Sequence, residues 1–258
     1  MRTTKSQLHL PMNILELQTR ARGWQAFILV DLLVVLALLG VLVLTVAAGT
    51  SGDVSKRLAC ADNLRRLYSA TQTWGTDNAG VYPNRGADYP YYVSQSFRNT
   101  LTNAYKLERK NFYCPANPSW NNDSLWDFSS SSSVLGYSYF AGYPDFNSPY
   151  FIAVYYPANG ALPGGDNLRN HLPVFAVNLT DQPYYPILWT DLSRKYLGDW
   201  RRERDTVRGA NHFGTDKPLG QNEVYLDGRV AWAAFAKFPS MPRMQYNSLD
   251  FFFYAGRP

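Results

Sequence analysis

A long apolar run near the N-terminus limits what this chain can fold into. From Phe27 to Ala48 the sequence reads FILVDLLVVLALLGVLVLTVAA, with Asp31 as its only charged residue. A membrane-spanning helix needs about 20 predominantly apolar residues, whereas the apolar core of a secretory signal runs to about 7–15. The run therefore predicts a transmembrane helix over residues 27–49. Because it has no polar face, we do not expect a buried helix of a soluble protein.

The pattern changes after the apolar run. Between residues 50 and 75, apolar residues recur at three- and four-residue steps, and charged residues occupy the opposite side. This period is that of a helix with one buried face. We expect an amphipathic continuation of the same helix to residue 75. Its buried face should pack on a domain through Leu58, Leu64, Leu67 and Tyr68.

Residues 76–258 are predicted to form a β-rich head. Most of the 16 prolines lie there, which argues against further long helices. Within the head, Asp227-Gly228 separates two β-prone runs and favours a two-residue hairpin turn. The expected fold class is α+β, with an antiparallel sheet laid on the amphipathic half of the helix. The expected strand regions are 148–156, 173–177, 185–190 and 223–232, and the five serines at 129–133 predict a flexible loop.

Charge and motif content exclude two classes of function. The formal net charge is +5, and the first 26 residues hold four cations against Glu16, so the remaining chain carries only +2. A nucleic-acid-binding domain needs a basic stripe on its folded part, and we expect no nucleic-acid partner. The chain has neither a G-x-S-x-G nor an H-E-x-x-H motif. We therefore expect no catalytic residues and no enzyme.

The segment from Ala26 to Gly40 resembles the N-terminal cleavage and methylation segment of type IV prepilins and type II secretion pseudopilins. That resemblance implies a pilin-like fold and a leader peptide over residues 1–26. A prepilin peptidase would cut between Ala26 and Phe27 and methylate the new amine. Asp31 would neutralise the amine of a neighbouring subunit during assembly, although a helix-dipole acid at the membrane interface is the alternative. The family nearly always has Gly before the cut and Glu as the acid.

The resemblance implies a structural subunit or accessory of a type IV pilus or type II secretion pseudopilus. Its partners would be other pilin-like subunits. The chain would cross the bacterial inner membrane once, with its head in the periplasm or in an extracellular filament. The alternative is a membrane-anchored glycan- or ligand-binding envelope protein that is not assembled into filaments. Stacking platforms for glycans could come from Trp120, Trp126, Trp189, Trp200 and the aromatic run 251–254.

A second resemblance lies in the head. Asn211-His212 followed by Asp227-Gly228 resembles the C-terminal His, spacer and Asp-Gly of large prepilin-like proteins of planctomycete- and verrucomicrobia-type bacteria. Their spacer is commonly about nine residues; here fourteen residues intervene, so we expect an enlarged loop. Shorter pieces agree in their order along the chain: Cys60-Ala61-Asp62-Asn63-Leu64, residues 77–83, Tyr113-Cys114-Pro115, residues 136–139 and Thr190-Asp191.

The two cysteines and the polar residues near His212 complete the candidate sites. Outside the cytoplasmic membrane Cys60 and Cys114 are readily oxidised, so we expect a disulfide, with two buried free thiols as the alternative. The sequence predicts no cofactor and no zinc site. An oxygen-rich Ca²⁺ site on His212, Asp216, Glu223 and Asp227 is a second interpretation of that region; the first is a histidine that is hydrogen-bonded within its own loop.

Overall fold

The computed structural model describes residues 30–39, 52–147, 167–200, 209–246 and 249–254, which fall into two units, Met1–Ser51 and Gly52–Pro258. In the first unit, residues 30–39 form an α-helix, and its large apolar side chains are between 51% and 64% exposed. Among the described residues no helix has the length and apolar character needed to cross a membrane. The rest of the predicted 27–49 span, with Ala26 and Phe27, lies outside the described residues.

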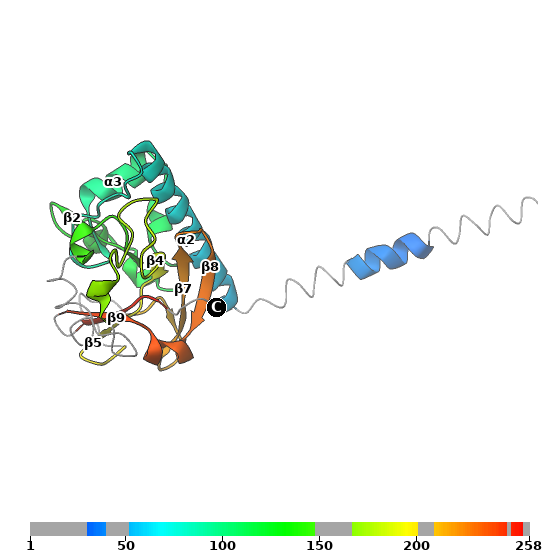
Figure 1. The fold of residues 1–258 in the computed structure, drawn as a ribbon. Helices are drawn as coiled ribbons and strands as arrows, with labels where there is room; N and C mark the ends of the chain where they lie inside the picture. Colours follow the sequence, from blue (N-terminus) through cyan, green and yellow to red (C-terminus); the bar gives the residue numbers. More distant parts are fainter. Residues whose placement is uncertain (1–29, 40–51, 148–166, 201–208, 247–248, 255–258) are drawn as a thin grey trace, which may run out of the picture. The chain divides into compact units, whose positions relative to one another are not determined.

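The second unit begins with helix α2, Gly52–Asp77 (Figure 1). Its buried face runs through Cys60, Leu64, Leu67 and Thr71, as the period of the sequence predicts. The helix ends where the chain turns into the left-handed conformation, with φ of 55° at Ala79 and 81° at Gly80. There the Gly80 amide donates to the carbonyl oxygen of Gly75 at 2.8 Å, which satisfies a terminal acceptor.

The prediction for Leu58 is wrong: its side chain is 56% exposed. Leu58 lies nine residues before Leu67, and at about 100° per residue this places the two on opposite sides of the helix. The buried stripe is centred on Leu64 and Leu67, both 0% exposed. Tyr68 packs against the core at the edge of that stripe. Leu58 therefore belongs to the free face of α2.

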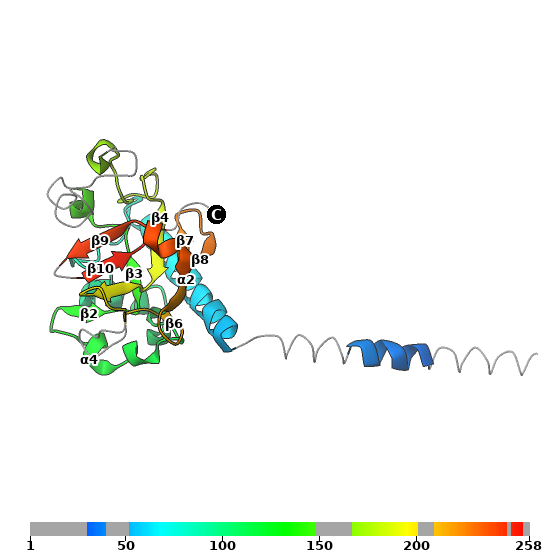
Figure 2. The same cartoon turned by 90° about the horizontal axis from the view of Figure 1, so that it is seen from below.

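An antiparallel sheet of five strands lies beside α2, as Figures 1 and 2 show. The order of its strands is β3, β4, β7 and β6, and β8 also pairs with β7. α2 contacts β4, β7 and β8, so the sheet covers the buried face of the helix. The strands are β3 (Tyr137–Tyr139), β4 (Ile187–Asp191), β6 (His212–Phe213), β7 (Pro218–Tyr225) and β8 (Val230–Ala234).

The described part of this unit also contains two smaller antiparallel sheets and several short helices. The sheets pair β1 (Tyr92–Ser94) with β2 (Ser132–Val134), and β10 (Leu249–Phe252) with both β5 (Arg194–Tyr196) and β9 (Arg243–Tyr246). The α-helices are α3 (Gln95–Asn103) and α4 (Asp123–Trp126). The 3₁₀ helices are η1 (Arg109–Phe112), η2 (Pro118–Trp120), η3 (Pro144–Asn147), η5 (Leu168–Asn170) and η6 (Phe235–Ser240). The fold class is α+β with antiparallel sheets.

The expected strand regions have mixed outcomes. β4 begins two residues after the start of the expected region 185–190 and ends one residue beyond it, and β7, the turn and β8 together span the region 223–232. Residues 173–177 form no strand, because the side-chain oxygen of Asn147 accepts from the amides of Val174 and Phe175 at 2.7 and 3.2 Å. Of the serine loop, Ser132 and Ser133 belong to β2. The whole of the region 148–156 lies outside the described residues.

The β7–β8 hairpin turns differently from the prediction. The Gly228 amide donates to the Tyr225 carbonyl oxygen at 3.0 Å, and the Tyr225 amide donates to the Arg229 carbonyl oxygen at 3.0 Å. Gly228 has φ of 82°, whereas Asp227 is not among the residues with positive φ. This is a three-residue loop, a type I turn followed by a left-handed glycine. A single left-handed glycine is enough to close it.

Candidate functional site

A buried cluster of cysteine, histidine and aspartate lies between α2 and the sheet. Cys60 comes from the buried face of α2, and Cys114 follows η1. Asp191 ends β4, and His212 begins β6. All four side chains are at most 4% exposed. Three elements and the segment after η1 therefore supply this cluster.

The structure contains the predicted disulfide between Cys60 and Cys114, with their Cα atoms 5.1 Å apart. That separation lies within the range usual for disulfides, about 4.4–6.8 Å. The bond closes a loop between positions 54 residues apart and joins α2 to the head. In the chain-entropy view, a loop of this length stabilises the fold by about 4 kcal/mol.

Asp191 is the centre of the hydrogen-bond network around the disulfide. Its Oδ2 accepts from the amide nitrogen of Asn222 at 2.6 Å and from Asn222 Nδ2 at 2.8 Å. Its Oδ1 accepts from Asn211 Nδ2 at 3.1 Å. A fully buried carboxylate is costly unless several donors satisfy it, and these asparagines supply them. They also hold the carboxylate in one orientation.

His212 joins that carboxylate to the disulfide. Its Nε2 lies 3.1 Å from Asp191 Oδ2 and 3.6 Å from Cys114 Sγ. Its ring meets the Trp232 ring edge-on, with centroids 5.2 Å apart. Packing on one side and hydrogen bonding on the other therefore fix the position of the imidazole.

Tyr137 lies beside the same network. Its hydroxyl oxygen accepts from Asn63 Nδ2 at 3.3 Å. Burial raises the pKa of Tyr137 well above its usual value, and the nearby charge of Asp191 raises it further. The phenol is therefore neutral at neutral pH and remains so at pH 10.

The network unites pieces of sequence that the resemblance singled out separately. Asn63 donates to the Tyr113 carbonyl oxygen at 3.2 Å, and so connects the helix piece to the Tyr113-Cys114 piece. Asn211 donates to the Gly136 carbonyl oxygen at 2.7 Å as well as to Asp191. The sequence pointed to each piece, but it did not show that they meet at one buried place.

The grouping of His212 with Asp216, Glu223 and Asp227 is not formed. Asp216 and Asp227 are exposed, and Glu223 is buried elsewhere, accepting from Tyr225 Oη at 2.7 Å. In the described part of the chain, the single group able to ligate a metal around His212 consists of Cys60, Cys114, Asp191 and His212. Asp191 was named in the sequence but was not grouped with His212, because it lies 21 positions before it, on another strand.

The Asp-Gly end of the motif contacts α2 at a second place. Tyr68 Oη donates to the Leu226 carbonyl oxygen at 3.2 Å, and Gln72 Nε2 donates to the same oxygen at 3.3 Å. A Cβ atom built on Gly228 would lie 3.1 Å from the Tyr68 ring. The histidine end of the motif therefore lies near Cys60 and the glycine end near Tyr68. The two contact points are eight residues apart on α2, about 12 Å along its axis.

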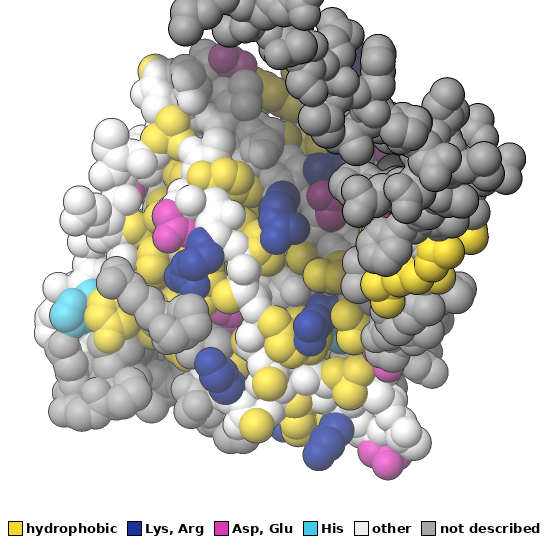
Figure 3. All heavy atoms as spheres, turned by 90° about the vertical axis from the view of Figure 1, so that its right-hand side faces the viewer, with side chains coloured by type: hydrophobic (Ala, Val, Ile, Leu, Met, Phe, Trp, Pro, Cys, Tyr) yellow, Lys and Arg dark blue, Asp and Glu magenta, His cyan; other side chains and the backbone are white. Residues whose placement is uncertain are grey.

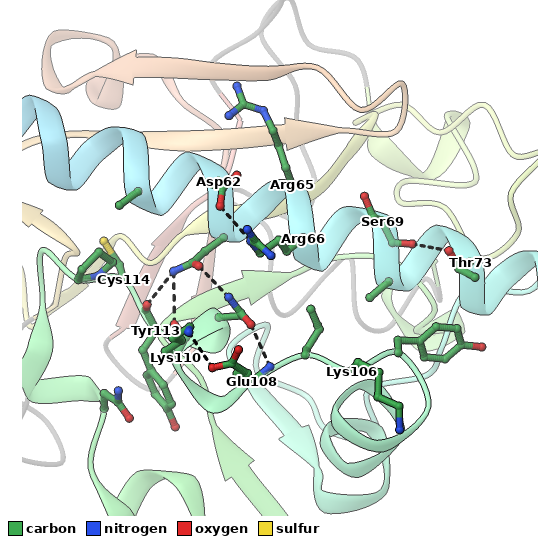
Figure 4. Close-up of a pocket in the computed structure, with 18 residues that line it drawn as sticks. Asp62, Arg65, Arg66, Ser69, Thr73, Lys106, Glu108, Lys110, Tyr113 and Cys114 are labelled. Atoms are coloured by element: carbon green, nitrogen blue, oxygen red, sulfur yellow. Dashed lines mark hydrogen bonds and ion pairs between the residues drawn. The ribbon is translucent and has the colours of Figure 1, made fainter.

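A groove of about 1040 Å³ runs along the other side of α2 (Figure 4). Its wall on α2 includes Asp62 and Arg66, which pair at 2.9 Å, and its opposite wall includes Glu108 and Lys110, which pair at 2.7 Å. These pairs are exposed, and such pairs contribute about 0–1 kcal/mol. Cys114 is among the residues that line the groove, so the groove reaches the disulfide.

Most of the aromatic residues considered as glycan platforms belong to the core. Trp120 and Trp189 are 0% exposed, and residues 251–253 are at most 5% exposed. Trp200 packs with Phe238 and Phe252 in a second, smaller core cluster. Only Trp126 and Tyr254 are partly exposed. The buried aromatic residues cannot serve as a stacking platform for glycans, because such a surface must be reachable from solvent.

Charged side chains are dispersed on the surface that Figure 3 shows. Lys and Arg lie apart from one another there, between apolar and neutral polar groups. Asp31 is exposed in the helix of residues 30–39.

Comparisons of the chain with protein-family profiles, with curated proteins and with solved structures gave no match.

Proposed function

We propose that the protein is a prepilin-like structural subunit or accessory of a type IV pilus or type II secretion pseudopilus. The observation that carries the proposal is the succession of two kinds of helical sequence. An apolar run with one acid is followed by α2, which holds an antiparallel sheet on one face. That succession suits a subunit with a membrane end and a head end. Prepilin peptidase and other pilin-like subunits are its proposed partners.

The helix of residues 30–39 supports the same proposal. Its apolar side chains are more than half exposed, including Leu33 at 58% and Leu38 at 64%. Exposed apolar surface of this extent is stabilised by lipid or by the apolar helices of other subunits. The proposed location is therefore the bacterial inner membrane, crossed once, with the head in the periplasm or in a filament.

Asp31 is the proposed assembly residue. A carboxylate in a low-dielectric setting is costly on its own, and a positively charged amine from an adjacent subunit would offset that cost. The proposed amine is that of Phe27 after cleavage following Ala26.

Mass spectrometry of the protein from cells that contain a prepilin peptidase tests the processing step. The expected mature chain begins at N-methylated Phe27. An intact Met1 in such cells would contradict the proposal.

Substitution of Asp31 tests the assembly step. Asp31→Ala is expected to abolish incorporation into filaments, and Asp31→Glu to retain or improve it. Asp53, in the first turn of α2, provides a matched control: Asp53→Ala removes an acid outside the apolar run and should leave incorporation unchanged. Equal incorporation of Asp31→Ala and the parent chain would show that the acid has no role in assembly. Failure of the parent chain itself to enter filaments would favour the alternative, an anchored ligand-binding protein that does not assemble.

A further inference from the structure

The buried cluster has the composition of a metal site as well as of a disulfide. Cys60, Cys114, Asp191 and His212 each offer one ligand atom, and these atoms all lie within 4.8 Å of one another. In a tetrahedral zinc site, with bonds of about 2.0–2.3 Å, ligand atoms lie about 3.3–3.8 Å apart. His212 Nε2 is already 3.1 Å from Asp191 Oδ2 and 3.6 Å from Cys114 Sγ. Small side-chain movements would bring all four to one centre.

We propose that, once the disulfide is reduced, these four side chains bind one Zn²⁺ ion. Two thiolates, one imidazole and one carboxylate are ligand types that zinc takes, and four of them fill a closed structural site. The disulfide and the metal are then alternative occupants of the same place, because both use the same two sulfur atoms. Either one joins α2 to the head.

The exchange balances in electrons and protons. A dithiol reductant gives two electrons and two protons to the two sulfur atoms and itself becomes a disulfide. Zn²⁺ then displaces the two thiol protons to solvent as the Zn–S bonds form. With two thiolates and one carboxylate, the filled site carries one net negative charge. The hydrogen bonds that Asn211 and Asn222 donate to Asp191 favour that charge.

The surroundings of the cluster fit the role. Metal-ligating carboxylates are usually oriented by hydrogen bonds from outside the ligand set, and both asparagines do this for Asp191. Cys114 is among the residues that line the groove beside α2, and its side chain is 1% exposed. A reductant or an ion therefore reaches the sulfur atoms only when the head opens locally. The inference does not depend on the proposed role in filaments, because it concerns the interior of the head alone.

Cobalt is the probe for this site, since tetrahedral Co²⁺ with thiolate ligands absorbs visibly. The full-length chain in mild detergent is reduced with a dithiol, freed of reductant without oxygen, and titrated with Co²⁺. We expect one equivalent to bind, with tetrahedral visible bands and a sulfur-to-cobalt charge-transfer band, and Zn²⁺ to displace it. The oxidised chain should show neither band.

Variants separate the four-residue site from binding by thiolates alone. Cys60→Ser should lose most of the charge-transfer band, and Asp191→Asn and His212→Gln should each weaken binding and change the visible bands. Asn222→Ala, which removes a positioning residue, should weaken binding about 10–100-fold. His171→Gln and Asp216→Asn alter residues outside the cluster and should leave the titration unchanged.

Two outcomes would overturn the proposal. One is the absence of the cobalt bands in a reduced chain that near-ultraviolet circular dichroism shows to be folded. The other is a set of bands that Asp191→Asn and His212→Gln leave unaltered. If reduction unfolds the head, recovery of the folded spectrum on addition of Zn²⁺ supports the site, and failure to recover it counts against the site.

Discussion

The helix of residues 30–39 and helix α2 differ in the exposure of their apolar side chains. The first is apolar on every side except at Asp31, and its large apolar residues are exposed. The second mixes apolar and charged residues, and its apolar stripe is buried against the sheet. The difference shows where each finds its partner. α2 finds it within its own chain, whereas under the proposed function residues 30–39 find theirs in lipid or in another subunit.

The largest expected difference between the head and the helix of residues 30–39 is in their response to a pH above 10. Burial is the main cause that raises the pKa of Tyr82 from 10.0 to about 12, and it also raises those of Tyr137 and Tyr139 well above 10.0. A raised pKa adds stability that is fully present below pH 10 and is lost as the pH rises towards the folded-state value. For Tyr82 alone the loss between pH 10 and 12 is about 2 kcal/mol.

Near-ultraviolet circular dichroism across this pH range measures the loss. The head should unfold cooperatively above pH 10, and Tyr82→Phe should move the onset upward. Residues 30–39 contain no tyrosine, so titration does not touch them. A head that keeps its spectrum at pH 12 would contradict the role of the buried tyrosines.

Truncation on the two faces of α2 is the next test. Leu67 is 0% exposed, so Leu67→Ala should lower the free energy of unfolding by about 2–5 kcal/mol. Leu58→Ala, on the free face at 56% exposure, should change it by less than about 0.5 kcal/mol. Thermal or urea unfolding in detergent measures both. Equal effects would mean that the free face of α2 is also covered.

Two glycines with the same backbone conformation isolate the contact between the hairpin and α2. Gly80 and Gly228 have φ of 81° and 82°, so alanine at either should cost about 1–2 kcal/mol. A Cβ on Gly80 meets nothing within 4 Å, whereas one on Gly228 lies 3.1 Å from the Tyr68 ring. Gly228→Ala should therefore destabilise the head more than Gly80→Ala. The same loss of stability in both would show that the ring moves away freely.

Asp31→Ala should have the smallest effect on the head. Asp31 belongs to the unit Met1–Ser51, while the described core residues begin at Cys60. We expect the melting temperature of the head to stay within experimental error and the free energy of unfolding to change by less than about 0.5 kcal/mol. A larger change would show that the two helices are not energetically separate.

Periodic features were predictable from the sequence. The extent of α2 was expected to residue 75 and ends at Asp77, because its burial repeats at the helical period. The hairpin was predictable because Asp227-Gly228 is a local signal, but the two-residue turn was wrong because Asp227 does not take positive φ. The strand expected at 173–177 failed because the side chain of Asn147, far from it in sequence, satisfies its amides.

The candidate site was only partly predictable. The cysteine pair followed from there being two cysteines, and His212 stood out through its motif. That Asp191 lies beside His212 depends on the register between β4, β7 and β6, which no single segment specifies. Polar residues on separate strands come together through tertiary packing alone. Sequence proximity pointed instead to Asp216 and Asp227.

The position of the disulfide decides how the head would respond to pulling. Tension applied at Gly52 travels along α2 only as far as Cys60, roughly two helical turns, before it reaches a covalent bond. There it crosses to Cys114 and bypasses the intervening chain, including the rest of α2 and all of α3. That segment bears no load while the bond is intact. Mechanical unfolding would therefore extend the oxidised head by a shorter length than the reduced head, by the contour of the bypassed loop.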